Sequence, residues 1–324
     1  IQKRPLMLVC RVLFLGFGII TTLKHPTRTH PNMHAVLLVI LGAIWSSAFL
    51  FIKIGVETIP PMTVAAGRIV LAAILLWIYL KIRGERLPPW GRVWWVVFLV
   101  GLLGNGLPFT LVGWGEQRID SSLAAILMAI MPLSTVLLSH FLTSDERLNG
   151  PRMAGVAFGL AGVVILVGPE TLLRLGDDAW RQLAVAGCAL CYAAAAVAAR
   201  KLPPLSPASR GAAVMLCATL QMLPLALWFD QPWALTPSTE SIVSVVYLGL
   251  FPTALATIML FYLLTLRGAT YVAMNNYLIP VFGVFLGALF LGEQITAQAI
   301  GALALILIGI AIASFRMKPL APPV

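Results

Sequence analysis

Charge is scarce in this sequence. Charged residues make up 10% of its 324 residues, hydrophobic residues make up 60%, and the mean hydropathy is +0.95. A soluble globular protein is excluded, because uncharged apolar runs of about 20 residues recur along nearly the whole length. Each such run is long enough to cross about 30 Å of hydrocarbon as a helix. The composition therefore predicts an all-α integral membrane protein.

Acidic residues are missing from the middle of every apolar run. Glu116, Glu146 and Glu293 all fall at predicted helix ends. Coupling to protons through the membrane interior needs an embedded titratable group. The sequence therefore favours transport that no intramembrane carboxylate drives. Paired acids or histidines that could hold a metal are also missing, so we expect no catalytic residues, metal or cofactor, and an enzyme acting on lipid substrates is only a remote alternative.

Cysteine is rare as well. Three of the four cysteines, Cys188, Cys191 and Cys217, fall inside apolar runs, where a thiol behaves as a small apolar group. Cys188 and Cys191 have the spacing of a redox motif but lack its soluble βαβ context. We therefore expect no redox role.

The net charge of +10 has a membrane explanation. Most basic residues lie in short connections, twelve on one side of the predicted membrane and four on the other. Positive residues stay on the cytoplasmic side. The pattern predicts two cytoplasmic termini and no nucleic-acid partner.

Ten spans can be drawn, joined by short connections. They cover about 35–55, 62–81, 93–114, 121–142, 152–168, 180–199, 209–229, 240–264, 269–291 and 297–315. Residues 1–33 form an N-terminal tail that we expect to be non-native or poorly ordered, with Met33 as the native start, and residues 317–324 form a C-terminal tail.

One stretch occurs twice. Gly101-Leu102 leads to Pro132, and Gly249-Leu250 leads to Pro280, at a constant offset of 148 positions. This indicates a duplication with halves at 34–168 and 180–316. Because each half has five spans, the second half must enter the membrane from the opposite side. Inverted repeats are typical of secondary transporters that bind substrate between the halves near the midplane.

An ordered set of motifs runs through both halves. Its members are Trp45-Ser46-Ser47-Ala48-Phe49, Lys53, Pro60-Pro61, Arg68, the first-half residues Pro132, Glu146 and Gly155, and the second-half residues Pro280, Glu293 and Gly301. Over residues 34–316 this resembles the EamA family of the drug/metabolite transporter (DMT) superfamily, most closely the YddG-type amino-acid exporters. The resemblance implies ten helices, an inverted five-helix repeat, a central cavity and efflux of small metabolites across a bacterial inner membrane.

Helix breaks are predicted where glycine and proline gather. The expected hinge residues are Gly104, Gly106, Pro108, Pro132, Pro252 and Pro280. Backbone groups freed there need partners in a cavity, a neighbouring helix or a ligand. Asn105 and Thr253 occupy matching positions beside the breaks, so they either contact a polar substrate from both halves or only bond neighbouring helices.

Further cavity candidates are polar or aromatic residues within the spans. They are Trp45, Ser47, Phe109, Tyr192, Tyr262 and Asn276. Asn275 and Asn276 point about 100° apart, so at most one faces a cavity, and Pro280 favours Asn276. Arg68 either reaches the outer interface or anchors a substrate carboxylate. Lys53 is expected to reach the interface.

These features predict a monomeric, multi-pass inner-membrane transporter that exports amino acids, aromatic or apolar ones in particular, or related small metabolites by alternating access. An aromatic cavity suits such side chains, and its rings also attract an ammonium group. A drug, sugar, nucleotide-sugar or other metabolite carrier of the same fold is the main alternative, since fold does not decide substrate.

Overall fold

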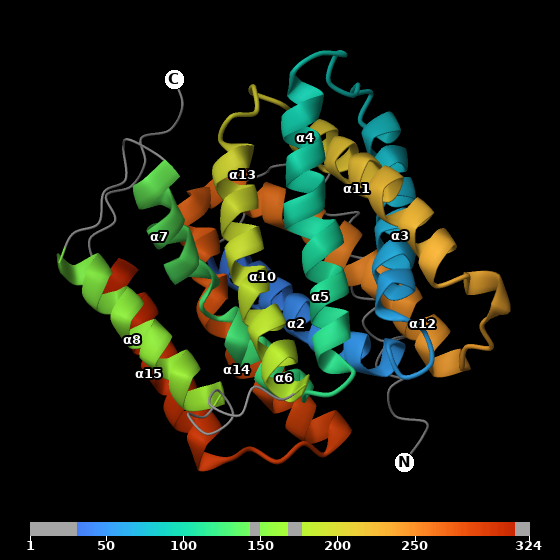
Figure 1. Cartoon of the computed structure of the whole chain (residues 1–324). Helices are drawn as coiled ribbons and strands as arrows, with labels where there is room; N and C mark the ends of the chain where they lie inside the picture. Colours follow the sequence, from blue (N-terminus) through green and yellow to red (C-terminus); the bar gives the residue numbers. More distant parts are fainter. Residues whose placement is uncertain (1–30, 143–149, 168–176, 315–324) are drawn as a thin grey trace.

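The computed structural model describes residues 31–142, 150–167 and 177–314 (Figure 1). Every regular element in these ranges is helical, and no strand occurs in them. The elements are α2 Pro31–Gly55, α3 Pro61–Ile82, α4 Val93–Gly101, η1 Leu102–Gly106, α5 Leu107–Glu116, α6 Ser121–Met128, α7 Met131–Leu142, α8 Gly150–Val167, α10 Asp177–Ala199, α11 Pro207–Phe229, η2 Pro232–Ala234, α12 Thr239–Leu248, η3 Gly249–Leu255, α13 Ala256–Ala273, α14 Asn275–Leu286, η4 Gly287–Leu291 and α15 Ala297–Ser314.

The predicted N-terminal tail is described only from residue 31, where α2 already begins. Its earlier residues, the C-terminal tail at 317–324 and Glu146 lie outside the described residues.

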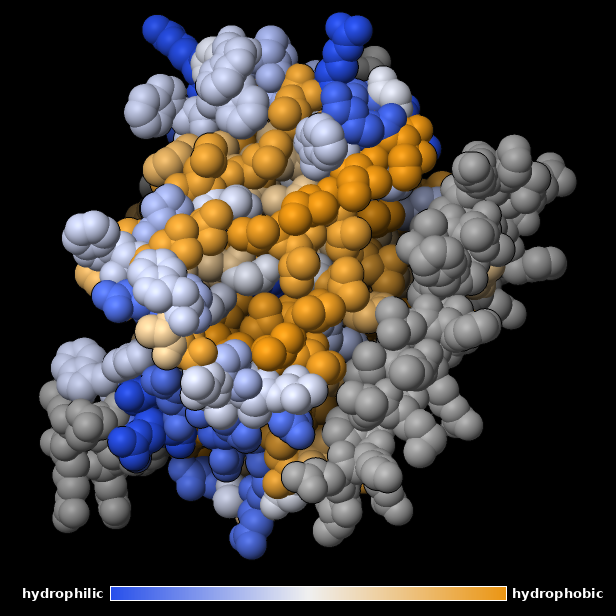
Figure 2. Space-filling model, turned by 90° about the vertical axis from the view of Figure 1, so that its right-hand side faces the viewer, coloured by the Kyte–Doolittle hydropathy of each residue, from blue (hydrophilic) through white to orange (hydrophobic). Residues whose placement is uncertain are grey.

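The helices account for the apolar runs of the sequence. Among the described residues, seven helical stretches are long and apolar enough to cross a membrane, and three shorter apolar helices occupy Met153–Leu166, Asn275–Leu291 and Ala297–Ile312. The face seen in Figure 2 carries a hydrophobic band across its middle, with hydrophilic residues gathered toward the two ends of the molecule. This arrangement is that of an integral membrane protein.

One predicted connection is absent. The predicted spans leave a turn at about 265–268. In the structure α13 continues through this segment to Ala273, and the helix is interrupted only at Met274. The segment Thr265-Leu266-Arg267-Gly268 contains no proline to end a helix. A single glycine costs a helix only about 1 kcal/mol, which packing offsets.

Packing between the helices follows the duplication. Helix α8 packs along α15, and α3 packs along α11, each pair joining equivalent helices of the two halves (Figure 1). In the same way α14 packs against α2 and α7 packs against α10, while α13 packs against α2 and α5 packs against α10. Each contact has its counterpart in the other half, so the two halves meet around a common central region.

The third span of each half contains a π-helical segment. Segment η1 separates α4 from α5, and η3 separates α12 from α13. Glycine and proline at the predicted breaks weaken the ordinary α-helical bonding, and the looser winding of a π segment accommodates the backbone groups that they leave. Both predicted breaks therefore occur as local changes of winding and not as gaps in the span.

A glycine stands at the start of each of these regions, where the helix meets a neighbour closely. A Cβ on Gly249 would lie 2.7 Å from the Leu71 Cβ atom. A Cβ on Gly101 would lie 3.2 Å from backbone atoms of Ala218 and Val214. The Gly-Leu that opens each copy of the repeat thus allows close helix approach, as small residues do in membranes.

Candidate functional site

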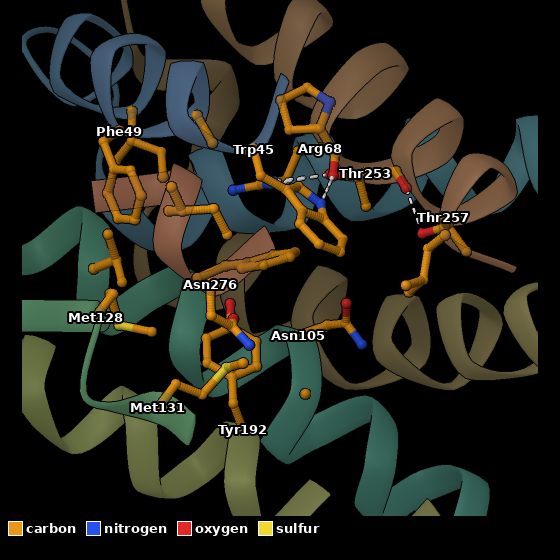
Figure 3. A pocket seen from close by; sticks show the side chains of 18 of the residues that line it. Trp45, Phe49, Arg68, Asn105, Met128, Met131, Tyr192, Thr253, Thr257 and Asn276 are labelled. Carbon is orange, nitrogen blue, oxygen red and sulfur yellow. Dashed lines mark hydrogen bonds between the residues drawn. The ribbon is translucent and has the colours of Figure 1, made fainter. Parts of the chain in front are cut away.

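A cavity of about 350 Å³ lies between the two halves (Figure 3). This size is in the range of small-molecule sites. Its lining residues are Trp45, Ala48, Phe49, Ile52, Arg68, Gly104, Asn105, Phe109, Val112, Met128, Ala129, Met131, Tyr192, Met215, Pro252, Thr253, Thr257, Leu260, Asn276, Ile279 and Pro280.

Most of the lining consists of equivalent positions of the two halves. Six pairs are separated by 148 positions and two by 147 positions. The pairs are Gly104 with Pro252, Asn105 with Thr253, Phe109 with Thr257, Val112 with Leu260, Met128 with Asn276, Met131 with Ile279, Trp45 with Tyr192, and Arg68 with Met215. Equivalent positions of the two halves therefore form most of the cavity wall.

Arg68 is the charged residue of this lining. Its side chain is 3% exposed, and its Nε and Nη2 atoms donate to Thr253 Oγ1 at 3.1 and 3.0 Å. The guanidinium carbon lies 3.7 Å from the centroid of the Phe109 ring. In the described part of the chain no acidic side chain forms an ion pair with it. A guanidinium has five N–H donors, so it retains donors for an anionic group in the cavity.

Thr253 completes the support of Arg68. Pro252 has no N–H to offer the Leu248 carbonyl oxygen, and the Thr253 hydroxyl donates to that oxygen at 2.7 Å instead. The hydroxyl proton is thus used, and the oxygen accepts from Arg68. The Trp45 indole Nε1 donates to the Pro252 carbonyl oxygen at 3.2 Å. Backbone groups freed in η3 are therefore satisfied by residues of the cavity wall.

The remaining wall is mainly apolar and aromatic. Phe49, Met128 and Met131 lie toward the left of Figure 3, while Asn105 and Asn276 present amide groups. Methionine and aromatic side chains adapt to apolar groups of varied shape, and amides bond polar ones. The arrangement suits a small molecule with one anionic end and an apolar body.

A protein-family model, described as the EamA-like transporter family, matches residues 33–168 and again residues 179–315. This chain belongs to the EamA-like transporter family. It is a membrane transporter and not an enzyme, and the two matches correspond to repeated halves.

Named relatives of this EamA-like transporter agree with that assignment. It is 28% identical to the uncharacterized inner membrane transporter YedA of Escherichia coli K12, over 88% of this chain and 93% of the relative. It is 27% identical to a probable terminal-alkyne amino-acid exporter of Streptantibioticus cattleyicolor, over 79% and 84% of the two chains. The protein is a multi-pass protein of the inner membrane.

A solved crystal structure shares the fold of this transporter. Its TM-score is 0.62 at 23% sequence identity, over 88% of this chain and 98% of the other.

The structure brings most of the sequence-predicted candidates to one place. Trp45, Arg68, Asn105, Phe109, Tyr192, Thr253 and Asn276 all line the cavity, as do the expected hinge residues Gly104, Pro252 and Pro280. Asn275, the neighbour of Asn276, is turned away and buried at Gly42 of α2.

Other candidates lie outside the lining. Ser47 is buried and bonds the Ile44 carbonyl oxygen and the Tyr247 hydroxyl, and Tyr262 packs against the core. Gly106 packs against Met222, Pro108 is buried, and Pro132 occupies the first turn of α7.

The structure excludes one of the two alternatives for Arg68 and contradicts the expectation for Lys53. Arg68 does not reach the interface. Lys53 also turns inward, and its Nζ atom donates to the backbone oxygens of Glu116 and Ile119 at 2.8 and 2.7 Å. Glu116 ends α5 as expected, yet its side chain is completely buried.

Residues that sequence reasoning missed are mostly apolar. Phe49, Met128, Met131, Met215 and Leu260 carry no signal that separates a cavity wall from a lipid-facing or core position. The repeat offset does point to Met128, which is the equivalent of Asn276.

Proposed function

We propose that this transporter exports amino acids, preferably aromatic or apolar ones, by alternating access. The observation that supports this most is the buried guanidinium of Arg68, the charged residue of an otherwise apolar and aromatic cavity. A free cation in such a place is expensive unless an anion joins it. The carboxylate of an amino acid is an anion of suitable size and geometry.

The amino acid would bind with its carboxylate at Arg68. Asn105 and Asn276 provide amide oxygens for the ammonium group, and the faces of Trp45 and Tyr192 attract it as well. The side chain would then lie against Phe49 and the neighbouring methionines. The probable amino-acid exporter of Streptantibioticus cattleyicolor, a relative at 27% identity, supports this substrate class.

We propose ten spans with both termini in the cytoplasm. The seven long and three shorter apolar helices supply that number, and the distribution of Lys and Arg sets the orientation. The halves at 34–168 and 180–316 then form an inverted repeat. A monomer suffices, because the cavity is built entirely within one chain.

The movement would use the two π-helical segments and the prolines near them. Segments η1 and η3 both contribute to the lining, and Pro280 interrupts the bonding of α14 beside Asn276. Looser winding at these points allows the two ends of each span to tilt separately. The halves can then open the cavity to each side in turn.

Other carriers of this fold fit less well. A nucleotide sugar carries several phosphate charges, whereas the lining offers the single guanidinium of Arg68. A cationic drug would call for an acid, and no Asp or Glu is among the lining residues.

Counterflow in liposomes tests this function. Liposomes with the purified protein are loaded with one unlabelled amino acid at a time, and entry of the same labelled amino acid is followed. We expect saturable exchange of aromatic and apolar amino acids, and none in protein-free liposomes. Exchange of a nucleotide sugar or a cationic drug in place of every amino acid would overturn the proposal.

A further inference from the structure

Glu116 is a buried acid that the proposed transport step does not use. It lies one helical turn beyond Val112, which lines the cavity. Its side chain is 0% exposed, and neither carboxylate oxygen has a hydrogen-bond partner among the described residues. An ionised carboxylate enclosed in this way is strongly disfavoured, since nothing replaces the water that it loses. The neutral acid is the form that suits this environment.

Three charged groups from other elements lie near enough to Glu116 to interact with its charge. Lys53 of α2 gives its ammonium protons to the backbone oxygens of Glu116 and Ile119. Arg68 of α3 is held by Thr253 and Phe109. The Glu293 carboxylate, which follows η4, accepts from Ser121 and Ser122. Neither cation forms an ion pair with Glu116 in the described part of the chain.

Contacts between the two halves close this end of the bundle around Glu116. Glu293 Oε1 accepts from Ser121 N and Oγ, both at 2.8 Å, and Oε2 accepts from Ser122 N at 2.9 Å. Arg181 of α10 donates to the Trp114 carbonyl oxygen and, at 3.2 Å, to Gln117 Oε1. To open this end the protein must separate these groups. Their separation would admit water to Glu116 and would let the ammonium of Lys53 pair with it.

We propose that Glu116 is a proton-binding site linked to the opening of this end of the bundle. With the end closed, Glu116 holds one proton as a neutral acid. When the end opens, the acid gives that proton to water and becomes a carboxylate beside Lys53. Because the closed form binds one more proton than the open form, acidic pH favours closure and alkaline pH favours opening. The inference rests on the proposed function only in requiring that this end opens during transport.

Infrared spectroscopy of the purified full chain in lipid nanodiscs tests the site without any substrate. We expect a carboxylic-acid C=O band at neutral pH that is lost in Glu116→Gln. Glu240→Gln, which changes an exposed acid of α12, should retain it. A band that is the same in Glu116→Gln and wild type would overturn the proposal. If Glu116→Gln does not fold, Glu116→Asp decides, since it must shift the band.

The pH dependence of exchange tests the linkage, with whichever amino acid the liposomes exchange. In wild type the rate should change with pH by up to about tenfold per unit, the limit for one proton. In Glu116→Gln this dependence should disappear, and an unchanged dependence would contradict the linkage. If neither protein exchanges any amino acid, the proposed function fails, while the infrared result still decides whether Glu116 holds a proton.

Discussion

The first half of the repeat places Arg68 and Phe109 at the cavity, where the second half places Met215 and Thr257. Likewise Met128 of the first half occupies the position that Asn276 occupies in the second half. The backbone positions are equivalent, but the chemistry is not. Charge is present in one half, and the hydroxyl of Thr253 that holds it comes from the other.

The shared backbone and the differing side chains of the two halves have separate roles, one in movement and one in substrate recognition. Equivalent helices, π segments and glycines give two halves that can move in the same way, as the alternating access that we propose requires. Different side chains at equivalent positions give a cavity with distinct ends, so that an asymmetric substrate binds in one orientation. Each variant below tests one side of this distinction.

Replacement of Arg68 by its counterpart should have the largest effect. Arg68→Met makes the first half resemble the second, where Met215 stands. Loss of a buried charged partner costs about 2–5 kcal/mol, so we expect amino-acid exchange to fall by about 100-fold. Counterflow measures the loss. Arg83→Met, which removes a charge paired with Glu85 outside the cavity, should leave exchange near wild type.

Thr253→Val should show that the second half supports the charge of the first. It removes the acceptor of two Arg68 bonds and the donor to the Leu248 oxygen. A hydrogen bond to a charged group contributes about 1.5–3 kcal/mol, so the KM for exchange should rise by about tenfold or more. Thr219→Val, at a hydroxyl that bonds only within α11, is the matched control. Equal KM values for the two variants would refute this role of Thr253.

Alanine substitutions at the two glycines that open the repeats, Gly101 and Gly249, should lower the Tm by different amounts. Gly249→Ala brings a Cβ to 2.7 Å from Leu71, whereas Gly101→Ala brings one to 3.2 Å from backbone atoms of α11. Overpacking costs about 1–3 kcal/mol, and we expect the larger loss of Tm in detergent for Gly249→Ala. Gly187→Ala has open space and should not lower Tm. A higher Tm for Gly249→Ala would mean that close approach there is not required.

Trp45→Phe should have the smallest effect. It keeps an aromatic ring but removes the donor to the Pro252 oxygen, while its counterpart Tyr192 stays in place. One such bond contributes about 0.5–1.5 kcal/mol, so exchange should fall by only about threefold to tenfold. Complete loss of exchange in this variant would show that the indole has a role beyond its hydrogen bond to the Pro252 carbonyl oxygen.

Hydropathy predicts the apolar helices of the described residues, because burial in hydrocarbon follows from each segment alone. The end of α13 was misplaced, since a single glycine does not decide whether a helix continues. The repeat offset identified Asn105 and Thr253 together, and the same offset applied to Asn276 leads to Met128.

Burial and direction of side chains could not be read from the sequence. Glu116 ends its span, where a charged group ordinarily reaches water, and Arg68 lies about two turns into its span, from where its long side chain could reach the interface. Contacts from α10, η3 and the segment after η4 enclose these regions, and these elements lie far away along the chain. Such enclosure depends on tertiary packing, which a local pattern does not encode.

The most direct test of the central claim compares an amino acid with its amide. The amide lacks the carboxylate that we place at Arg68 but keeps the rest of the molecule. In wild type the amide should inhibit exchange of the labelled amino acid about 100-fold more weakly than the amino acid does, and in Arg68→Met the two should be equal. If the amide inhibits the wild-type protein as strongly as the amino acid, Arg68 does not bind the substrate carboxylate and the account is wrong.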